Sequence, residues 1–538
     1  MKITTIISIA FTMVIGMGLV SCQKGDLTAN PNAAPITAIT PSLIINHLTA
    51  NLIRNEEMPF GDVNKSNQFQ ISNYSKYWGN NEYSWSYSAH SYDILSYAVQ
   101  LEKQASKQLG NTTNKYFALA KFFRAYSAIW LTQRVGDIPM LQAGNIDNLT
   151  PAFDSQHDVY KRSLMLLDSA NMMFNNLFAA ANPLKPGDVF DGGDIFGFTN
   201  LKWQKLINSY KLRILISLSK RADDNADLNI KTQFATIIAD AVKYPIMASN
   251  SDNMVYKYNA VNLYPIFQSG SSSYNNFMNV GKTVLDITTA NKDPRTFIYA
   301  TPASAQIAAG KTISDFTAYV GSDPKTALSD LQKSSDGGNL SFFNASRYLG
   351  SNTGATAEPF IFIGYPELCF NIAEGINRGW AATTDAKSYY DKGIASSFTN
   401  FGLNVNQNSS IVISNLLGAS WYSDIVKSTV TTDNATFLTN VTYNVASSSA
   451  ALTQILQQKY VAFFMNSGWE AFYNYRRTGV PVFSQGGPGT GTANSLIPRR
   501  WLYPIDEINY NNANYKTALT AQFDAGADNV TKDTWLTK

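Results

Sequence analysis

The densest group of residues able to contact a ligand is aromatic. Residues 74–97 hold eight Tyr and Trp in 24 positions, where the overall aromatic share of 13% predicts about three. Ser and Asn separate these rings, so the pattern differs from an ordinary core. Exposed Tyr and Trp rings stack on sugars or peptides, and their polar tips pair with hydroxyl groups. Two interpretations stay open, a ligand surface or rings packed under loops. The candidate ligand residues are Trp78, Tyr83, Trp85, Tyr74 and Tyr87.

The sequence contains few signals for catalysis. The chain has no GxSxG elbow, no Walker loop and no HExxH pair, and its two Cys and three scattered His offer no metal cluster. Asp191-Gly192-Gly193-Asp194 lacks the oxygen spacing of a calcium loop and is expected to be a plain turn. We therefore expect a protein that is not an enzyme, with no metal and no cofactor.

Several charged residues are expected to be structural. Glu367 and Glu374 are seven residues apart in a helical pattern, hence on one face, where ion pairs or caps are the expected role. The pairs Arg476-Arg477 and Arg499-Arg500 have aromatic neighbours, which indicates stacking within the fold.

Charge and composition narrow the class of partner. The 538 residues include 42 Lys and Arg against 39 Asp and Glu, a net charge of +3. Nucleic-acid binding, which needs clustered basic residues, is therefore not expected. Charged residues make up 15% of the chain, below the roughly 25% of ordinary globular proteins, and the apolar share of 45% supports a large core. Low charge with many Asn, Tyr and Trp favours a neutral glycan, although peptides use the same surface.

The N-terminus resembles a bacterial lipoprotein signal. The apolar run 6–20 has 15 residues, fewer than the roughly 20 needed to cross a bilayer, and follows Lys2. It ends in Leu19-Val20-Ser21-Cys22, which resembles a lipobox. We expect a signal peptide over 1–21, acyl chains such as palmitate on Cys22, and a tether over 22–41. The remaining thiol, Cys369, has apolar neighbours and is expected to be buried and inert.

The elements that would position these residues are mainly helical. Apolar spacing predicts helices over 115–134, 155–177, 201–221, 365–378, 384–398 and 452–475. Ser, Gly and Asn dominate two stretches, near 250–360 and 399–450, where loops with short strands are expected. Strands and helices never alternate as βαβ units. The prediction is one mainly α domain over 42–538, in which pairs of antiparallel helices suit the first half.

Several segments, taken in order, resemble the SusD/RagB family of outer-membrane nutrient-binding lipoproteins of Bacteroidota. Phe123-Arg124-Ala125-Tyr126 through Gly136-Asp137-Ile138-Pro139 is similar to the family's "RAY…GDIP" helix and exit turn. Further matches are Gly193-Asp194 with Trp203 and Leu212-Arg213, Asp293-Pro294-Arg295, Pro366-Glu367-Leu368 with Ala373-Glu374, Gln458-Lys459 through Arg476-Arg477-Thr478-Gly479, and Ile497-Pro498-Arg499-Arg500. The spacing is closest to the divergent second subgroup of SusD-like proteins. Where the family has "AEA", this chain has Ala373-Glu374-Gly375.

The resemblance implies a mainly α SusD-like fold, with tetratricopeptide-like helix pairs as scaffold, long loops and a few short strands. It implies an outer-membrane lipoprotein, lipid-anchored and facing the cell exterior. Such a protein passes an oligosaccharide or peptide to a SusC-like, TonB-dependent barrel. Two alternatives stay open besides a peptide ligand: a lid that completes the transporter without binding alone, and a surface glycosidase. Binding residues are not carried over from the family.

Overall fold

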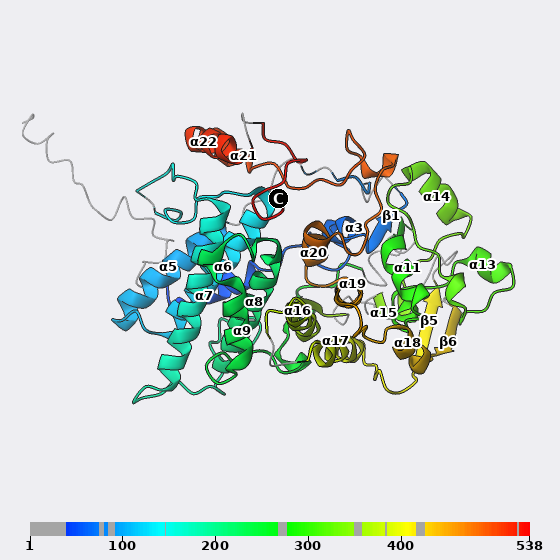
Figure 1. Ribbon diagram of the computed structural model, residues 1–538, viewed down its shortest axis with the longest axis horizontal. Helices are drawn as coiled ribbons and strands as arrows, with labels where there is room; N and C mark the ends of the chain where they lie inside the picture. The colour runs from blue at the N-terminus through cyan, green and yellow to red at the C-terminus, as the bar shows by residue number, and fades with distance from the viewer. Residues whose placement is uncertain are drawn as a thin grey trace, which may run out of the picture.

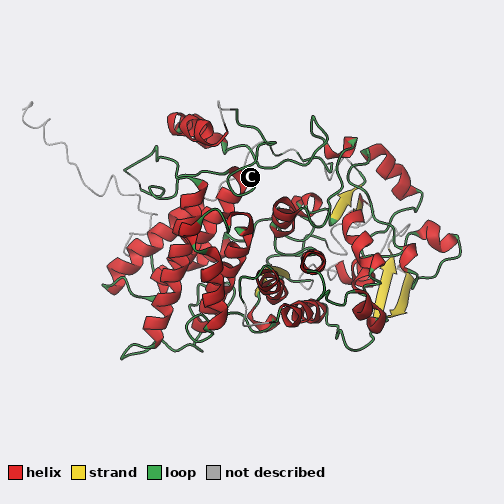
Figure 2. Ribbon diagram, viewed as in Figure 1, coloured by secondary structure: helices red, strands yellow, loops and turns green. Residues whose placement is uncertain are grey.

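The structure is a computed structural model that describes residues 39–74, 80–83, 85, 92–145, 147–266, 277–348, 358–381, 385–415, 426–523 and 527–538. Figure 1 shows a stack of long helices on one side and a region of shorter helices with small strand pairs on the other. Figure 2 shows how far helices outnumber strands and how much loop connects them. The expected mainly α class is confirmed.

Long helices form the first part of the scaffold. They are α2 (Pro41–Ala50), α5 (Tyr92–Leu109), α6 (Lys115–Val135), α7 (Gln156–Phe178), α8 (Asn200–Ser217) and α9 (Ile230–Ala239). Each of the helices α5 to α8 packs against the next one along the chain, which is the helix pairing expected from the sequence. The central helix α6 is apolar on most faces because it is covered on several sides; fifteen of its residues are buried.

Local sequence explains where these helices begin and end. The side chains of Asn114, Ser155 and Thr199 each accept a hydrogen bond from a backbone N–H in the first turn of α6, α7 and α8. Gly136 ends α6 with φ 101°, a conformation that side chains with a Cβ rarely adopt. The predicted boundaries of α6 and α7 are confirmed to within one residue.

A second group of helices packs on the scaffold through α8. It comprises α16 (Tyr365–Asn377), α17 (Ala386–Asn400), α19 (Ser448–Ala462) and α20 (Glu470–Thr478). Helix α16 contacts α8, α17 and α19. The single helix predicted over 452–475 is wrong, because the chain turns between α19 and α20. Met465, Ser467 and Gly468 have φ values of 59°, 61° and 53° there, which an α-helix does not allow.

The stretch near 250–360 is more helical than the expected loops with short strands. It contains α11 (Lys282–Ala290), α12 (Arg295–Tyr299), α13 (Ser304–Ala308), α14 (Leu328–Asp336) and α15 (Ala345–Tyr348). These helices have four to nine residues, too few for a clear apolar period. The remaining helices are α3 (Asp62–Ser66), α18 (Asn434–Asn440), α21 (Ile505–Tyr510) and α22 (Asn512–Phe523).

The strands in the described part of the chain form three antiparallel pairs. They are β1 (Gln70–Ser72) with β3 (Met278–Val280), β2 (Met254–Tyr256) with β4 (Phe360–Ile363), and β5 (Ser410–Asn415) with β6 (Val426–Thr431). In the first pair Ser72 lies opposite Met278, so the chain leaves β1 at the end where it enters β3. No helix among the described residues is long and apolar enough to cross a membrane.

The segment that leads into β1 is held by residues from far along the chain. Asn67 Nδ2 donates to the carbonyl of Gly468 at 2.8 Å, and its Oδ1 accepts the N–H of Phe472 at 3.1 Å. Gln68 Nε2 donates to the carbonyl of Ser484 at 2.7 Å. The segment that leads into β1 is therefore fixed by α20 and by the loops on either side of it.

Candidate functional site

Two of the five predicted ligand residues lie in the core. Tyr83 and Trp85 are 4% and 9% exposed. The Trp85 ring stacks on Trp501 with centroids 3.9 Å apart and an interplanar angle of 5°, and its other neighbours include Trp469 and Phe472. In this arrangement neither ring presents an open face, which favours for these two the interpretation of packing under loops.

The Tyr83 hydroxyl is also held inside the protein. It donates to the carbonyl of Ser66 at 3.1 Å and accepts from Gln68 Nε2 at 3.3 Å. Burial raises the pKa of Tyr83 far above its ordinary value. Tyr83 therefore helps to fix the segment that leads into β1.

Tyr74 occupies a different position, at the end of the β1–β3 pair. Its ring stacks on Phe277 with centroids 4.4 Å apart and an interplanar angle of 17°, and both rings are half-buried. Because β1 and β3 bring these residues to the same end, the pair forms a partly accessible aromatic surface. Among the predicted residues that the structure describes, Tyr74 is the one whose ring is partly exposed.

Buried amides hold this aromatic pair in place. Asn73 Nδ2 donates to Asn279 Oδ1 and to Ser335 Oγ, each at 2.7 Å. The side chain of Asn81 accepts the N–H of Ser72 at 2.7 Å and donates to its carbonyl at 2.8 Å, as a neighbouring strand would. Asn73 and Asn81, which lie among the aromatic residues in the sequence, therefore form part of the frame of the strand pair.

Trp78, Tyr87 and the lipidation residue Cys22 lie outside the described residues. Their predicted roles stay predictions.

A groove that the sequence analysis missed lies between the segments 53–61 and 256–265. Its volume is about 490 Å³, within the roughly 300–1,000 Å³ of small-molecule sites. None of its twelve described lining residues is charged; they are Ile53, Asn55, Met58, Pro59, Phe60, Gly61, Tyr256, Tyr258, Val261, Asn262, Leu263 and Pro265. We call this surface the neutral groove. Tyr rings, Pro and Asn amides are a lining that suits an uncharged ligand with hydroxyl groups.

Tyrosine hydroxyls without partners lie at and beneath the neutral groove. The buried hydroxyl of Tyr258, in the lining, makes no hydrogen bond, and neither does that of Tyr264, whose ring centroid is 4.9 Å from that of Tyr258. A buried hydroxyl without a partner is unfavourable and marks a place where another polar group can enter. The signal available in the sequence was three Tyr within residues 256–264, the same aromatic density that singled out 74–97.

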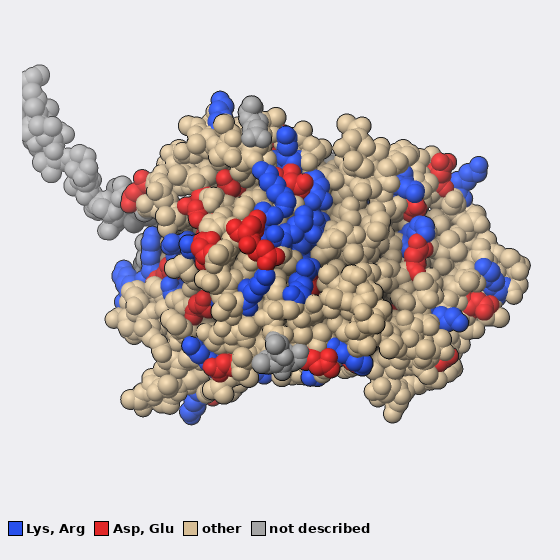
Figure 3. All heavy atoms as spheres, in the orientation of Figure 1, with Lys and Arg blue, Asp and Glu red and all other residues tan. Residues whose placement is uncertain are grey.

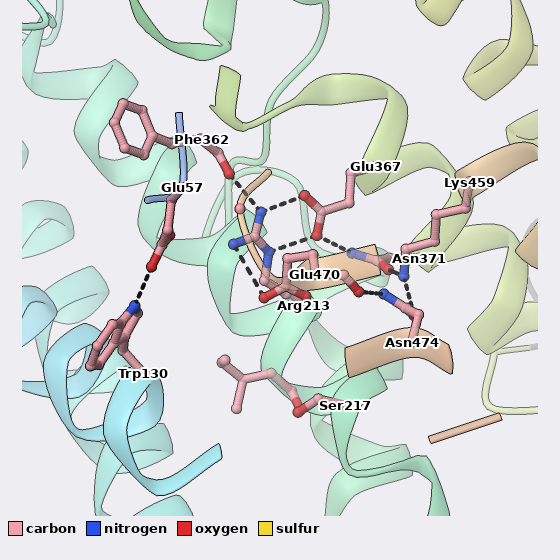
Figure 4. Close-up of polar contacts among 12 residues, drawn as sticks. Glu57, Trp130, Arg213, Ser217, Phe362, Glu367, Asn371, Lys459, Glu470 and Asn474 are labelled. Carbon is pink, nitrogen blue, oxygen red and sulfur yellow. Dashed lines mark hydrogen bonds and ion pairs between the residues drawn. The ribbon is translucent and has the colours of Figure 1, made fainter. Parts of the chain in front are cut away.

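The charged residues of the quoted motifs converge in a buried network that joins α8, α16, α19 and α20 (Figure 4). Arg213 Nε donates to Glu367 Oε1 at 2.6 Å, and another of its nitrogens donates to the carbonyl of Phe362 at 3.0 Å. Lys459 Nζ donates to the side-chain oxygens of Asn371 and Asn474 at 2.6 and 2.9 Å. The structural role expected for Glu367 is confirmed.

Glu374 is the centre of the second half of this network. It is fully buried and pairs with Arg477 and with Arg378. Burial by itself would raise its pKa, but the charge and hydrogen bonds of Arg477 outweigh burial and hold the pKa at about 2. Burial also lowers the pKa of the neighbouring Lys459 to about 8. The expected structural ion pair at Glu374 is confirmed, and the motif residues act as scaffold.

The other arginines of these pairs are structural as well. Arg476 donates to the carbonyls of Gln133 and Arg499 at 2.6 and 2.9 Å. The Arg500 guanidinium lies 4.6 Å from the centroid of the Phe523 ring, and the side chain is fully buried. The expected stacking within the fold is confirmed for Arg500.

The turn at 191–194 and the thiol of Cys369 are structural too. Asp191 accepts hydrogen bonds from Ser42, Tyr116 and the N–H of Gly193, which fixes the start of α2 to this turn. Burial raises the pKa of the Cys369 thiol to about 12, so it stays protonated, as expected. Among the described residues no group of His, Cys, Asp and Glu is arranged to hold a metal ion.

Comparison with known proteins places the chain in a family. The model of a family described as "starch-binding associating with outer membrane", SusD-like in its second subgroup, matches residues 29–504. A comparison with curated proteins finds no match.

Several solved structures are similar to this chain. A SusD homologue from Bacteroides fragilis is 26% identical, with a TM-score of 0.77 over 93% of this chain and 100% of that one. An outer-membrane protein of Bacteroides vulgatus, described in terms of nutrient binding, is 28% identical, with a TM-score of 0.74 over 93% and 100%. A chitin-binding SusD homologue from Flavobacterium johnsoniae shares the fold at 20% identity, with a TM-score of 0.65 over 92% and 98%. The chain belongs to the SusD-like family of outer-membrane-associated binding proteins.

Proposed function

We propose that this protein is an outer-membrane lipoprotein that binds a neutral oligosaccharide and passes it to a SusC-like, TonB-dependent transporter. The observation that carries the choice of ligand is the neutral groove, with its uncharged lining and its unpartnered Tyr258 hydroxyl. None of the described lining residues carries a charge that could pair with a charged polymer. Sugars offer apolar ring faces for tyrosine and hydroxyl groups for amides, which is the complement of this lining.

Two further observations support a neutral glycan. Most of the face drawn in Figure 3 is uncharged, in keeping with the 15% of charged residues in the chain. One structural relative binds chitin, itself a polymer of uncharged sugars. The Tyr74–Phe277 pair and the predicted residues Trp78 and Tyr87 would extend the contact surface. Tyr83 and Trp85 would support it from the core.

The role of this protein is binding rather than catalysis. The carboxylates of Glu367 and Glu374, which the sequence places on one helix face, are buried and paired with arginine, which leaves neither of them free to act on a glycosidic bond. This chain would then capture the ligand, and the transporter would carry it across the membrane. Affinity would be modest, because a partly open groove buries little area and ordering of loops opposes binding.

The test is binding of the purified protein to neutral glycans, acidic glycans and peptide digests by affinity electrophoresis and calorimetry. We expect binding of a neutral glycan that Tyr258→Ala or Asn262→Ala weakens at least fivefold, because stacking or amide contacts are lost. Trp78→Ala and Tyr74→Ala test the aromatic segment in the same assay. The matched control is Tyr510→Ala, which removes an exposed ring outside the neutral groove.

The outcomes separate the alternatives. Binding of peptides alone would replace the glycan with an oligopeptide as ligand. Absence of binding to every class, together with recovery of a barrel partner from membranes, would favour the lid that completes a transporter. Release of products from the glycans above a heat-treated control would contradict the proposal of a binder without catalysis.

A further inference from the structure

A second groove, chemically unlike the first, lies where the start of α5, the loop 139–151 and the segment 504–511 meet. Its volume is about 450 Å³. Apolar lining residues include Leu95, Leu149, Pro139 and Pro504, and the ring of Tyr510 forms part of the wall. It shares no lining residue with the neutral groove.

Large apolar side chains are left open to solvent at this groove. Leu149 is 82% exposed and Tyr510 74% exposed, and the adjacent Leu141 and Ile505 are 53% and 41% exposed. Isolated exposed Leu residues are common on proteins, but several at one hollow with a polar rim are typical of a binding surface.

The charged residues among the described lining residues of the groove have one sign. They are Asp93, Asp506 and Glu507, and this lining includes no Lys, Arg or His. The whole chain, by contrast, has a small excess of basic residues. A cationic group at this surface would gain attraction from several carboxylates at once. We call this surface the acidic groove.

Hydrogen bonds hold its walls together. Asp154 accepts the N–H groups of Met140 and Leu141 at 2.9 and 2.8 Å, which fixes the start of the loop. Asn511 Nδ2 donates to the carbonyl of Pro151 at 2.8 Å and to Glu507 at 3.1 Å. The loop and α21 are therefore joined before anything binds, which limits the loss of conformational entropy on binding.

We propose that the acidic groove docks a peptide segment of a protein partner in which a Lys or Arg side chain is next to an apolar side chain. The apolar side chain covers Leu149 and Tyr510, and the cation lies beside Asp93 and Asp506. Charge complementarity selects this occupant: a neutral glycan gains nothing from the carboxylates, and an anionic membrane surface would be repelled. This site goes beyond glycan capture and does not depend on it.

The experiment uses full-length protein and two fluorescein-labelled six-residue peptides, one alternating Leu and Lys and the other alternating Leu and Glu, followed by fluorescence polarisation. We expect the Leu/Lys peptide to bind at least tenfold more tightly than the Leu/Glu peptide, with affinity that falls as salt rises. Asp93→Asn with Asp506→Asn should weaken binding at least fivefold. Leu149→Ser with Tyr510→Ser should weaken it at least tenfold, because the apolar contact is lost.

Two control variants test whether the changes in affinity are specific to the acidic groove. Val242→Ser and Asp188→Asn change exposed residues of the same kinds outside the acidic groove and should alter affinity less than twofold. Circular dichroism identifies any variant that fails to fold, and the single changes Asp93→Asn and Leu149→Ser then replace the double ones. Equal affinity for the two peptides, or equal affinity of the variants and the unchanged protein, would overturn the proposal. So would loss of glycan binding on Leu149→Ser, or a dimer in sedimentation that the same change dissociates.

Discussion

At the scale of single residues, the chain contains both buried and exposed ion pairs. Glu374 is fully buried between Arg477 and Arg378, whereas pairs such as Lys387–Asp391 lie at the surface with both side chains nearly half exposed. The two kinds of pair contribute differently to the free energy of unfolding, because water and salt screen the exposed pair and leave the buried one unscreened.

Removal of the central carboxylate should therefore destabilise the fold strongly. We expect Glu374→Gln to lower the free energy of unfolding by about 3–5 kcal/mol, since arginine and lysine would be left buried without a counter-charge. The matched control, Asp391→Asn, breaks the exposed pair and should change it by less than about 0.5 kcal/mol. Urea unfolding followed by circular dichroism measures both, and equal losses in the two variants would contradict this account of the network.

Asp137, in the turn after α6, makes stability depend on pH. Burial raises its pKa from 3.8 to about 6, against the opposing hydrogen bond from the N–H of Gln156. The folded protein thus binds this proton more tightly than the unfolded chain, so the free energy of unfolding rises as pH falls from about 6 towards 4. Glu374 has the opposite sign, because its pKa of about 2 removes stability as pH falls below 4.5.

Asp137→Asn should remove the rise in the free energy of unfolding that Asp137 causes as pH falls. The amide cannot ionise, and its oxygen can still accept the N–H of Gln156, which Asp137 accepts at 2.8 Å. We expect the gain of about 2 kcal/mol on acidification from pH 7 to 4.5 to disappear in this variant. Urea unfolding at four pH values in that interval measures it; a profile unchanged by Asp137→Asn would contradict the burial argument.

At the scale of elements, one glycine sets the contact between two helices. Gly375 in α16 faces the ring of Phe234 in α9, and an added Cβ would overlap that ring.

Gly375→Ala should destabilise the protein although alanine is the better helix former. The propensity gain is about 1 kcal/mol, and overpacking against the ring costs about 1–3 kcal/mol. We expect a lower melting temperature that Phe234→Leu partly restores in the double variant. Gly192→Ala, which has no atoms near the added Cβ, is the control. A rise in melting temperature in Gly375→Ala alone would contradict this packing.

The long helices could be predicted from the sequence because their signals are local. Asn114 and Gly136 delimit α6, and apolar spacing identifies the rest. Helices such as α12 could not be predicted, since five residues show no period and long-range hydrogen bonds hold them: Arg295 donates to Ser397 and to Gln458.

For the candidate site too, local sequence signals could be read, whereas contacts with distant residues could not be predicted. Aromatic density located residues 74–97 but could not separate Trp85 from Tyr74, because the rings that bury Trp85 come from residues near 470 and 500. The neutral groove joins two segments about 200 residues apart, and neither of them alone indicates a hollow.

At the scale of the whole molecule, we predict that a lipid on Cys22 attaches the protein to a membrane. No helix among the described residues is suited to cross a membrane. We expect Cys22→Ser to move the protein from the membrane pellet to the supernatant and to abolish incorporation of labelled palmitate. Ser21→Ala, the neighbouring change, should leave both unaltered. Membrane attachment that survives Cys22→Ser would require another anchor.

The long-range bonds of Asn67 and Gln68 also impose an order of assembly. Their partners are 401 and 416 residues further along the chain. At a synthesis rate of roughly 5–20 residues per second, those partners emerge about 20–80 s later. For that interval the segment before β1 has no place to dock, while the helix pairs α5 to α9 already have their neighbours. The segment around Asn67 and Gln68 is thus among the last parts of the chain to reach its native position, and a chaperone that shields it in the meantime would raise the yield of folded protein.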